Sequence, residues 1–443
     1  MNAMLLIYAH DYSPRLQFIF EFIFTQVIGV KWSLTHDEAA LLTHEGPVLA
    51  YSKDKLEGVP YIKSHTILFE EGVKEQELVV SQWGDYRVFF QTDKESVLPF
   101  DLFAASFYLM TRYEEYLDFE PDKYGRYPAE ASIAYRKNFI QRPVVDLWAY
   151  MLRDQLKKRY PDLTFEKRTF AFLPTLDVDQ AFAVRGKGFI RIAGSIVRDL
   201  FCLRFRDIYH KILVIKGTER DPFDSFDYID EVHQTFSLKP IFFFLNGKNS
   251  KYDRHIPLKK KIMQELVKKI DKRFEVAVHS SFKSFNNQKE FERLKKELEN
   301  TLKHPVTKSR QHYLKLAFPL TFKQLLNSGI KEDYSLGFAS INGFRAGTCT
   351  PFYFFDLLKN EKSGLTMIPF QVMDATCKYY YKKGTEGVLE EIKRLIDEVK
   401  RVDGLFVSLW HNDSLRQENG KSAFCDLYIQ MLDYINQKIE EVD

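Results

Sequence analysis

The stretch FAFLPTLDVD (residues 170–179) is an apolar run that ends in two carboxylates, Asp177 and Asp179. Runs this rich in aromatic and branched residues are typical of buried strands. Four comparable runs follow it: KPIFFFL (239–245), FEVAVHS (274–280), VTKSRQHY (306–313) and GLFVSLWH (404–411). They alternate with segments of helical apolar spacing, at 225–236, 257–270, 287–302, 320–329 and 386–402. This alternation predicts parallel strands joined by right-handed crossovers, as an open doubly wound sheet or a (β/α) barrel.

The first part of the chain has a different texture. Strand-like runs such as MLLIYA (4–9) and YRVFFQT (86–92) mix with a helical stretch, FDLFAASFYLMTRYEEYL (100–117). No spacing typical of catalytic motifs occurs there. We expect an α+β accessory domain over residues 1–165 and the alternating domain over residues 166–443.

Composition narrows the classes of function. The 64 Lys and Arg residues nearly balance 61 Asp and Glu residues over 443 positions, which argues against a partner held by bulk positive charge, such as nucleic acid. The four cysteines are too widely spaced to predict a disulfide framework or a thiolate metal site. The most apolar stretch, residues 18–30, contains Glu21 and Gln26, so we expect no transmembrane segment and a cytoplasmic protein. The oligomeric state stays open.

One segment interrupts the alternation. Residues 185–220 carry nine Lys or Arg against three acidic residues, interleaved with large apolar side chains. The pattern fits a substrate lid, a helix lying on a membrane surface, or an outer helix with a solvated basic face.

Reactive side chains follow the predicted strands at their carboxyl ends. Asp177 and Asp179 end the first strand, His279 the third, His312 the fourth and His411 the last. Barrel enzymes place their chemistry at this end. Strand alternation puts both carboxylates on one face, where one can bind a cation and the other act as a base; the alternative is a turn after the strand. Carboxylate and imidazole ligands suit a divalent ion such as zinc with a position open for water, which implies hydrolysis.

The motifs TLDVD (175–179), VAVHSS (276–281), SRQHY (309–313) and LFVSLWH (405–411), in this order, resemble those of the polysaccharide deacetylase (NodB-like) family. The likeness spans about residues 168–435 and implies a distorted (β/α) barrel. Two aspartates separated by one residue are similar to the branch with allantoinase-like and peptidoglycan deacetylase-like members. We therefore identify the chain as a divergent branch with an extra N-terminal domain.

The resemblance also implies roles for individual residues. They are Asp177 as general base, Asp179 and His279 as metal ligands, Arg310 orienting the base, the backbone N–H of Tyr313 as oxyanion donor, and His411 as general acid. The implied activity is metal-dependent, with zinc as the expected ion, and removes acetyl or other acyl groups from an N- or O-acetylated carbohydrate.

The chain departs from the family pattern at two places. Lys283 stands where the family has its second metal-binding histidine, and His312 replaces the proline after the motif arginine. We hypothesise that His312 restores the third ligand. If the metal is lost instead, the protein is an inactive glycan-binding relative. A third alternative is an allantoinase-like hydrolase of another small amide.

Two further polar residues are candidates for the site. Arg345, in the turn GFRAGT (343–348), either clamps an anionic group of the substrate or pairs with a carboxylate inside the fold. Asp374 ends another predicted strand and is a candidate to keep His411 protonated, with Asp333 as its rival.

Overall fold

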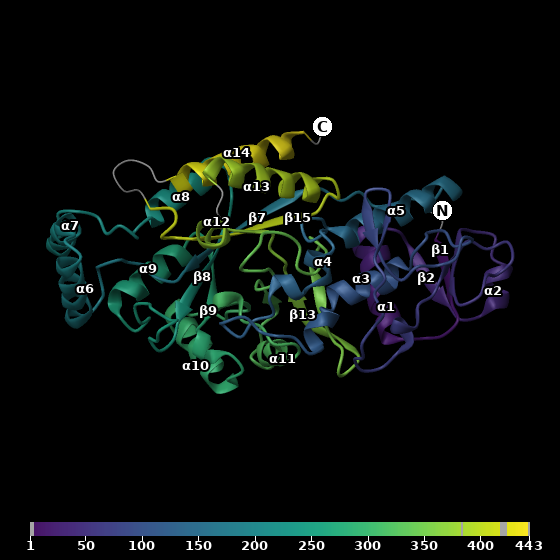
Figure 1. Cartoon of the computed structure of the whole chain (residues 1–443), viewed down its shortest axis with the longest axis horizontal. Helices are drawn as coiled ribbons and strands as arrows, with labels where there is room; N and C mark the ends of the chain where they lie inside the picture. Colours follow the sequence, from purple (N-terminus) through teal and green to yellow (C-terminus); the bar gives the residue numbers. More distant parts are fainter. Residues whose placement is uncertain (1–3, 382–383, 417–422, 442–443) are drawn as a thin grey trace.

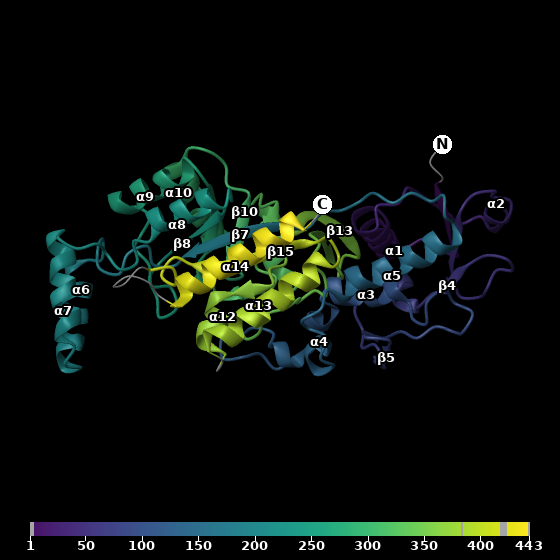
Figure 2. The same cartoon turned by 90° about the horizontal axis from the view of Figure 1, so that it is seen from above.

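The computed structural model describes residues 4–381, 384–416 and 423–441. The molecule is elongated (Figures 1 and 2). The N-terminal sheet lies at one end, a large sheet with its helices lies in the middle, and a hairpin of two helices, α6 (Phe189–Phe201) and α7 (Phe205–Lys216), projects at the other end.

The central sheet has nine described strands in the order β12-β13-β11-β10-β9-β8-β7-β15-β14. All neighbours are parallel except β12 and β13, which form an antiparallel pair. The strands are β7 (Ala171–Val178), β8 (Ile241–Asn246), β9 (Glu275–Ser280), β10 (Lys308–Gln311), β11 (Glu332–Asp333), β12 (Phe352–Asp356), β13 (Glu361–Met367), β14 (Val372–Met373) and β15 (Leu405–His411). The five strands expected from the sequence are present, each within a few residues of its predicted position.

Helices connect these parallel strands, as the alternation of the sequence predicted. Besides α6 and α7, the helices after β7 are α8 (Phe226–Thr235), α9 (Lys261–Asp271), α10 (Gln288–Leu302), α11 (Leu320–Asn327), α12 (Asp374–Tyr379) and α13 (Thr385–Lys400); α14 (Ala423–Glu440) follows the last strand. Helices α13 and α14 pack side by side along β7 and β15 (Figure 1). Short 3-10 turns follow β9 and β10, at η5 (Phe282–Ser284) and η6 (His312–Leu314).

The two regions of the sheet around β11 and β15 are linked by one continuous segment, residues 361–373. Its first half, β13, pairs with β11, and its last two residues, β14, pair with β15. Between them, Ile368 N–H donates to Asp333 O and Gln371 N–H donates to Val407 O. This part of the chain therefore has a mixed α/β fold. Full closure of its sheet into the expected distorted (β/α) barrel stays a prediction.

The N-terminal sheet is parallel throughout, which corrects the expectation of an α+β domain. Its order is β2-β1-β3-β4, with all three pairings parallel. The strands are β1 (Leu5–Ala9), β2 (Trp32–Thr35), β3 (Val48–Ser52) and β4 (Tyr61–Lys63), and a two-stranded pair, β5 (Ser81–Trp83) and β6 (Tyr86–Val88), follows. Helices cross between the strands: α1 (Pro14–Phe20), the π-helix η1 (Glu21–Val27) and α2 (Glu38–Leu42). Because these strands are short, their parallel pairing left only a weak signal in the sequence.

The segment between the two sheets packs against both. It contains η2 (Thr66–Phe69), α3 (Leu102–Met110), η3 (Tyr113–Tyr116), η4 (Ala129–Ala131), α4 (Ile133–Arg136) and α5 (Val144–Arg159). The largest hydrophobic cluster of the described residues includes side chains of both sheets, and Phe18 and Phe107 of the N-terminal part contact Phe355 of β12. Buried Asp146 of α5 accepts hydrogen bonds from Thr348 and Thr350. The domain boundary near residue 165 stays a prediction, and the residues before and after it share one hydrophobic cluster.

A buried histidine in α8 makes stability depend on pH. Burial lowers the pKa of His233 to about 4, and the ring contacts Ile229 O and the hydroxyl of Tyr428. A depressed histidine pKa stabilises the fold above about pH 6.5, and this contribution is lost as the pH falls toward 4. We expect the free energy of unfolding to fall by about 2 to 3 kcal/mol over this interval because of His233 alone.

The test is the free energy of unfolding, measured by denaturant titration at pH 7 and at pH 4.5 for the wild type and for His233→Gln. Glutamine can keep one donor and one acceptor but does not titrate. Equal pH dependence of the two proteins would contradict it.

Candidate metal centre and active site

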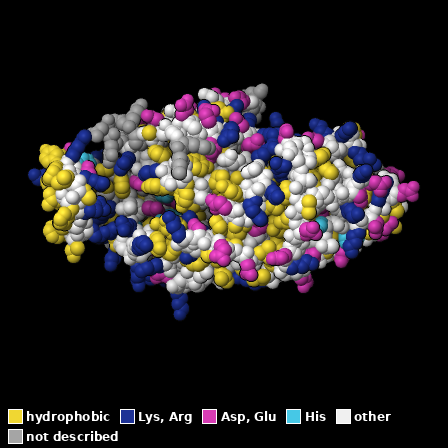
Figure 3. Space-filling model, in the orientation of Figure 1, with side chains coloured by type: hydrophobic (Ala, Val, Ile, Leu, Met, Phe, Trp, Pro, Cys, Tyr) yellow, Lys and Arg dark blue, Asp and Glu magenta, His cyan; other side chains and the backbone are white. Residues whose placement is uncertain are grey.

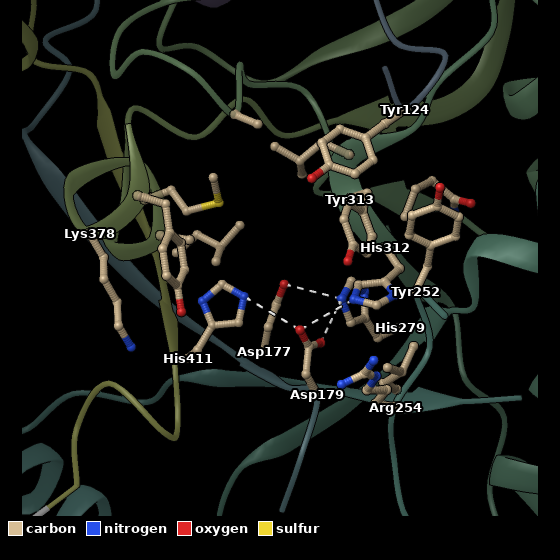
Figure 4. A pocket seen from close by; sticks show the side chains of 18 of the residues that line it. Tyr124, Asp177, Asp179, Tyr252, Arg254, His279, His312, Tyr313, Lys378 and His411 are labelled. Carbon is tan, nitrogen blue, oxygen red and sulfur yellow. Dashed lines mark hydrogen bonds and ion pairs between the residues drawn. The ribbon is translucent and has the colours of Figure 1, made fainter. Parts of the chain in front are cut away.

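The expected polar residues gather in one pocket at the carboxyl ends of the central strands (Figure 4). Asp177 lies on β7 and Asp179 directly follows it, His279 lies on β9, His312 follows β10, and His411 ends β15. The pairing register explains their meeting, because Asp177 is level with His411 on one side, and His279 is level with Arg310 of β10. The pocket has a volume of about 640 Å³.

Three side chains form a cluster that suits a metal ion. Asp179, His279 and His312 each offer a ligand atom, and these atoms lie within 4.8 Å of one another. Nε2 of His279 is 3.3 Å from Oδ1 of Asp179, and Nε2 of His312 is 3.3 Å from Oδ2. Oδ1 of Asp179 is buried without a hydrogen bond among the described atoms. A buried carboxylate oxygen in this position fits a cation, since buried acceptors otherwise find donors.

Both imidazoles are held with Nε2 facing Asp179. Nδ1 of His279 lies 2.9 Å from the carbonyl oxygen of Arg310, and Nδ1 of His312 lies 2.9 Å from Oδ1 of Asp253. Asp253 is itself fixed by the backbone N–H of Phe282. Metal-binding histidines in proteins are usually oriented through their second nitrogen in this way. The sequence did not reveal Asp253, because it lies in a charged loop with no motif around it.

The electrostatics of the cluster favour a positive charge. Burial raises the pKa of Asp179, but His312 and His279 outweigh burial and hold this pKa well below its ordinary value. Burial lowers the pKa of His312, while Asp179 and Asp253 raise it, with a net value of about 9. The two carboxylates that draw a proton onto His312 would equally attract a divalent cation.

Asp177 lies beside this cluster and is held by a different partner. Nη1 of Arg310 donates to Oδ1 of Asp177 at 2.7 Å, and the rest of the guanidinium donates to the Thr175 hydroxyl and to Tyr334 O. Arg310 is fully buried, so it fixes one oxygen of the carboxylate. The other oxygen, Oδ2, lies 3.5 Å from Nε2 of His279 and faces the pocket (Figure 4).

His411 lies across the pocket and is paired with Asp374. Nδ1 of His411 is 2.7 Å from Oδ1 of Asp374, and the backbone N–H of His411 donates to Oδ2. Burial lowers the pKa of His411, but Asp374 raises it, and the net pKa lies well above the usual value. The rival carboxylate, Asp333, accepts instead from the hydroxyls of Ser309 and Ser335. The structure therefore brings Asp374, and not Asp333, to His411.

Two sequence candidates lie outside the cluster. Lys283 is exposed on η5 and does not line the pocket, so position 283 offers nothing to the metal cluster. Arg345 is 3% exposed, and its guanidinium donates to both carboxylate oxygens of Glu115 and to Gly337 O. The expectation that Arg345 clamps a substrate anion is corrected: its donors are used inside the fold, as in the structural alternative.

The N-terminal part of the chain supplies one wall of the pocket, which the sequence did not predict. Lys123, Tyr124 and Arg126 line it, and Arg126 donates to the carbonyl oxygen of Tyr313 at 2.9 Å. Tyr313 has a left-handed backbone with φ of 62°. Such a conformation is uncommon for a non-glycine residue and occurs often at functional sites. The rings of Tyr124, Tyr252 and Tyr313 meet at this wall (Figure 4).

Comparisons with known proteins match the N-terminal part of the chain to one family, and similar solved structures cover from 61% to 100% of the chain. Residues 5–161 match a family of unknown function (DUF7033). A search of curated proteins found no match to the sequence. The chain covers more than four fifths of each of three similar solved structures, at TM-scores of 0.40 or less.

The first of these structures is a polysaccharide deacetylase from Mycobacterium smegmatis, so named provisionally, at 14% identity and a TM-score of 0.40 over 63% of this chain and 86% of that one. The second is a polysaccharide deacetylase from Bacillus cereus, at 11% identity and 0.30 over 61% and 89%. The third is the carbohydrate deacetylase Agd3, at 9% identity and 0.38 over 100% and 84%.

The geometry predicts which residues bind a metal. We expect the wild type to bind one equivalent of Zn²⁺ and His312→Ala to lose this binding, because only two ligands remain. Asp253→Asn should weaken the affinity by about 10- to 100-fold, since it removes the partner that orients His312. Metal content and isothermal titration of the purified proteins measure both effects.

Two matched variants serve as controls. His304→Ala removes an exposed imidazole that pairs with Asp271, and Lys283→Ala changes the family's second histidine position. Both should bind zinc as the wild type does. Unchanged stoichiometry in His312→Ala would show that His312 is not a ligand.

Proposed function

We propose that this protein is a metal-dependent hydrolase that removes acetyl groups from an N- or O-acetylated carbohydrate. The proposal rests on one observation: a carboxylate, a cluster suited to a metal ion and an imidazole lie in the same pocket. Asp177 lies beside the Asp179–His279–His312 cluster, and His411 faces them (Figure 4). A carboxylate outside the ligand set together with a protonated imidazole provides a base and an acid on either side of a scissile bond.

Asp179, His279 and His312 would hold the divalent ion, for which their carboxylate and imidazole donors favour zinc. When bound, the ion supplies Lewis acidity for the substrate carbonyl and for a water molecule. The resemblance to polysaccharide deacetylases described from the sequence assigns the same roles to Asp179 and His279.

Asp177 acts as the general base. Arg310 fixes its Oδ1, so Oδ2 is the oxygen that takes the proton of the attacking water. The backbone N–H of Tyr313 is the proposed donor to the oxyanion that forms when water adds to the carbonyl.

His411 acts as the general acid through Nε2. Its Nδ1 is held by Asp374, so the second ring nitrogen faces the pocket and is 3.9 Å from Oδ2 of Asp179. The raised pKa favours the protonated form of the imidazole. The proton passes to the leaving nitrogen or oxygen, which without it is too basic to depart.

The walls of the pocket suit a sugar. Aromatic side chains, which offer flat faces to sugar rings, line it together with basic residues: Tyr124, Tyr252, Tyr313, Tyr379 and Tyr380, and Lys123, Arg126, Lys251, Arg254 and Lys378. A pocket of about 640 Å³ is large enough for a small oligosaccharide segment.

The role of Asp177 predicts a separation of catalysis from metal binding. We expect Asp177→Asn to lower kcat for acetate release by about 10²- to 10⁴-fold, the usual contribution of a general base, with zinc binding retained. The assay measures acetate released from a panel of N- and O-acetylated oligosaccharides by the zinc-loaded protein. If Asp177→Asn loses zinc together with activity, the two carboxylates are assigned the wrong way round. If zinc-loaded wild type releases acetate from none of them, the deacetylase proposal fails.

The Asp374–His411 pair predicts a change in the pH profile. His411 acts in its protonated form, and Asp374 raises its pKa. In Asp374→Asn the pKa of His411 should fall, so the alkaline limb of kcat/KM should move to lower pH. Asp333→Asn, which alters a buried carboxyl that does not contact His411, should leave that limb in place. An unmoved alkaline limb in Asp374→Asn would contradict the assignment of His411 as the acid.

A further inference from the structure

The helical hairpin α6–α7 carries an unusual surface. It projects from the end of the molecule that lies opposite the N-terminal sheet (Figures 1 and 2). In the space-filling view, apolar side chains cover this projection, with Lys and Arg around them (Figure 3). Of the 23 large hydrophobic residues that are exposed in the described part of the chain, ten lie here: Phe189, Ile190, Val197, Leu200, Phe201, Leu203, Phe205, Tyr209, Ile212 and Ile215.

Burial in α6 is inverted relative to a helix that packs on a protein core, whereas the buried residue of α7 is the apolar Val214. Among the residues of α6, all of which the structure describes, the single buried one is the charged Asp199. Its carboxylate pairs with Lys211 of α7, and Lys211 also donates to the hydroxyl of Ser195. The two helices thus contact each other through polar groups, while Phe189 and Phe201 are 85% and 84% exposed. An apolar surface of this kind marks an interaction site.

The charge of the hairpin identifies the partner. Residues 185–220 carry nine basic and three acidic residues, a net charge of +6, whereas the whole chain has +3, so the remainder has −3. Arg204 and Arg206 flank the exposed Phe205 at the turn between the helices. Large apolar side chains surrounded by cations are the pattern of segments that insert into the headgroup region of anionic membranes.

The helices are too short to cross a bilayer. With 13 and 12 residues at about 1.5 Å per residue they reach about 20 Å, less than the hydrocarbon thickness of about 30 Å. Among the described residues, no helix has both the length and the apolar character that a membrane span needs. These dimensions allow the two helices to lie on a membrane surface but not to span the bilayer.

We propose that the α6–α7 hairpin docks this protein on the surface of an anionic phospholipid bilayer. The base of the hairpin is fixed to the rim of the pocket: Lys187 donates to the side chain of Gln180, a pocket residue, and Arg191 donates to His255 O. Lys260 donates to Gly186 O at 2.6 Å. Docking therefore holds the pocket next to the membrane surface.

The test is co-sedimentation of the full chain with two sets of vesicles, phosphatidylcholine alone and phosphatidylcholine with 30% phosphatidylglycerol. We expect wild-type protein to bind the phosphatidylglycerol vesicles in 0.1 M salt, and binding to weaken in 0.5 M salt. The double variant Phe201→Ser/Leu203→Ser should reduce the bound fraction at least tenfold, and so should Arg204→Glu/Arg206→Glu. The matched control Leu320→Ser/Leu358→Ser changes two exposed apolar residues elsewhere and should bind as wild type does.

Two results would overturn docking. One is wild-type protein that stays in the supernatant with both vesicle sets. The other is a concentration-dependent dimer that Phe201→Ser/Leu203→Ser abolishes without any vesicle binding, because a second copy then covers the hairpin. Acetate release from a soluble oligosaccharide is independent of this surface and should be equal in wild type and hairpin variants. Failure of the docking proposal and failure of the hydrolase proposal can therefore be distinguished.

Discussion

The site depends on the interaction of the Asp179 carboxylate with the imidazoles of both His279 and His312. It exists because parallel strands bring their carboxyl ends to one edge, and because the register sets Asp177 level with His411 and His279 level with Arg310. Each group is then fixed from behind: His279 by a backbone carbonyl, His312 by Asp253, and His411 by Asp374. The strands thus set the positions of these side chains, and buried hydrogen-bond acceptors set the orientations of their imidazole rings.

Arg310 shows why the centre tolerates so much buried charge. A guanidinium out of contact with water is costly unless all its donors are satisfied. Here Asp177, Thr175 and Tyr334 accept from its nitrogen atoms, and its charged carbon lies 4.3 Å from the ring centre of Phe243. A neutral amide of the same shape at position 177 would remove the counter-charge of Arg310 but keep an acceptor oxygen for its hydrogen bond, whereas a smaller side chain would remove both.

Much of the central sheet could be read from the sequence, because its strands are long apolar runs and its helices have regular spacing. The strand ends that carry Asp177, Asp179, His279, His312 and His411 were found in the same way, since alternation fixes which residues share a face. Contacts between distant segments left no such signal. Asp253 lies in a loop. The choice of Asp374 over Asp333 depends on the pairing of the two-residue strand β14 with β15, and Arg345 pairs with Glu115 across 230 positions of sequence. In the N-terminal sheet the run at 4–9 was recognised and is β1, but the other parallel strands, with only three to five residues each, were not.

The contact between Arg126 and the carbonyl of Tyr313 joins parts of the chain that lie 187 positions apart. Together with Phe18, Phe107 and Phe355 in the shared core, it makes the first third of the chain a piece of the pocket's architecture. A shortened chain that begins at the central sheet would expose aromatic core and lack the wall that carries Tyr124. Replacing the first third of the chain alone would therefore alter the pocket itself, in contrast to enzymes whose accessory units are joined by linkers.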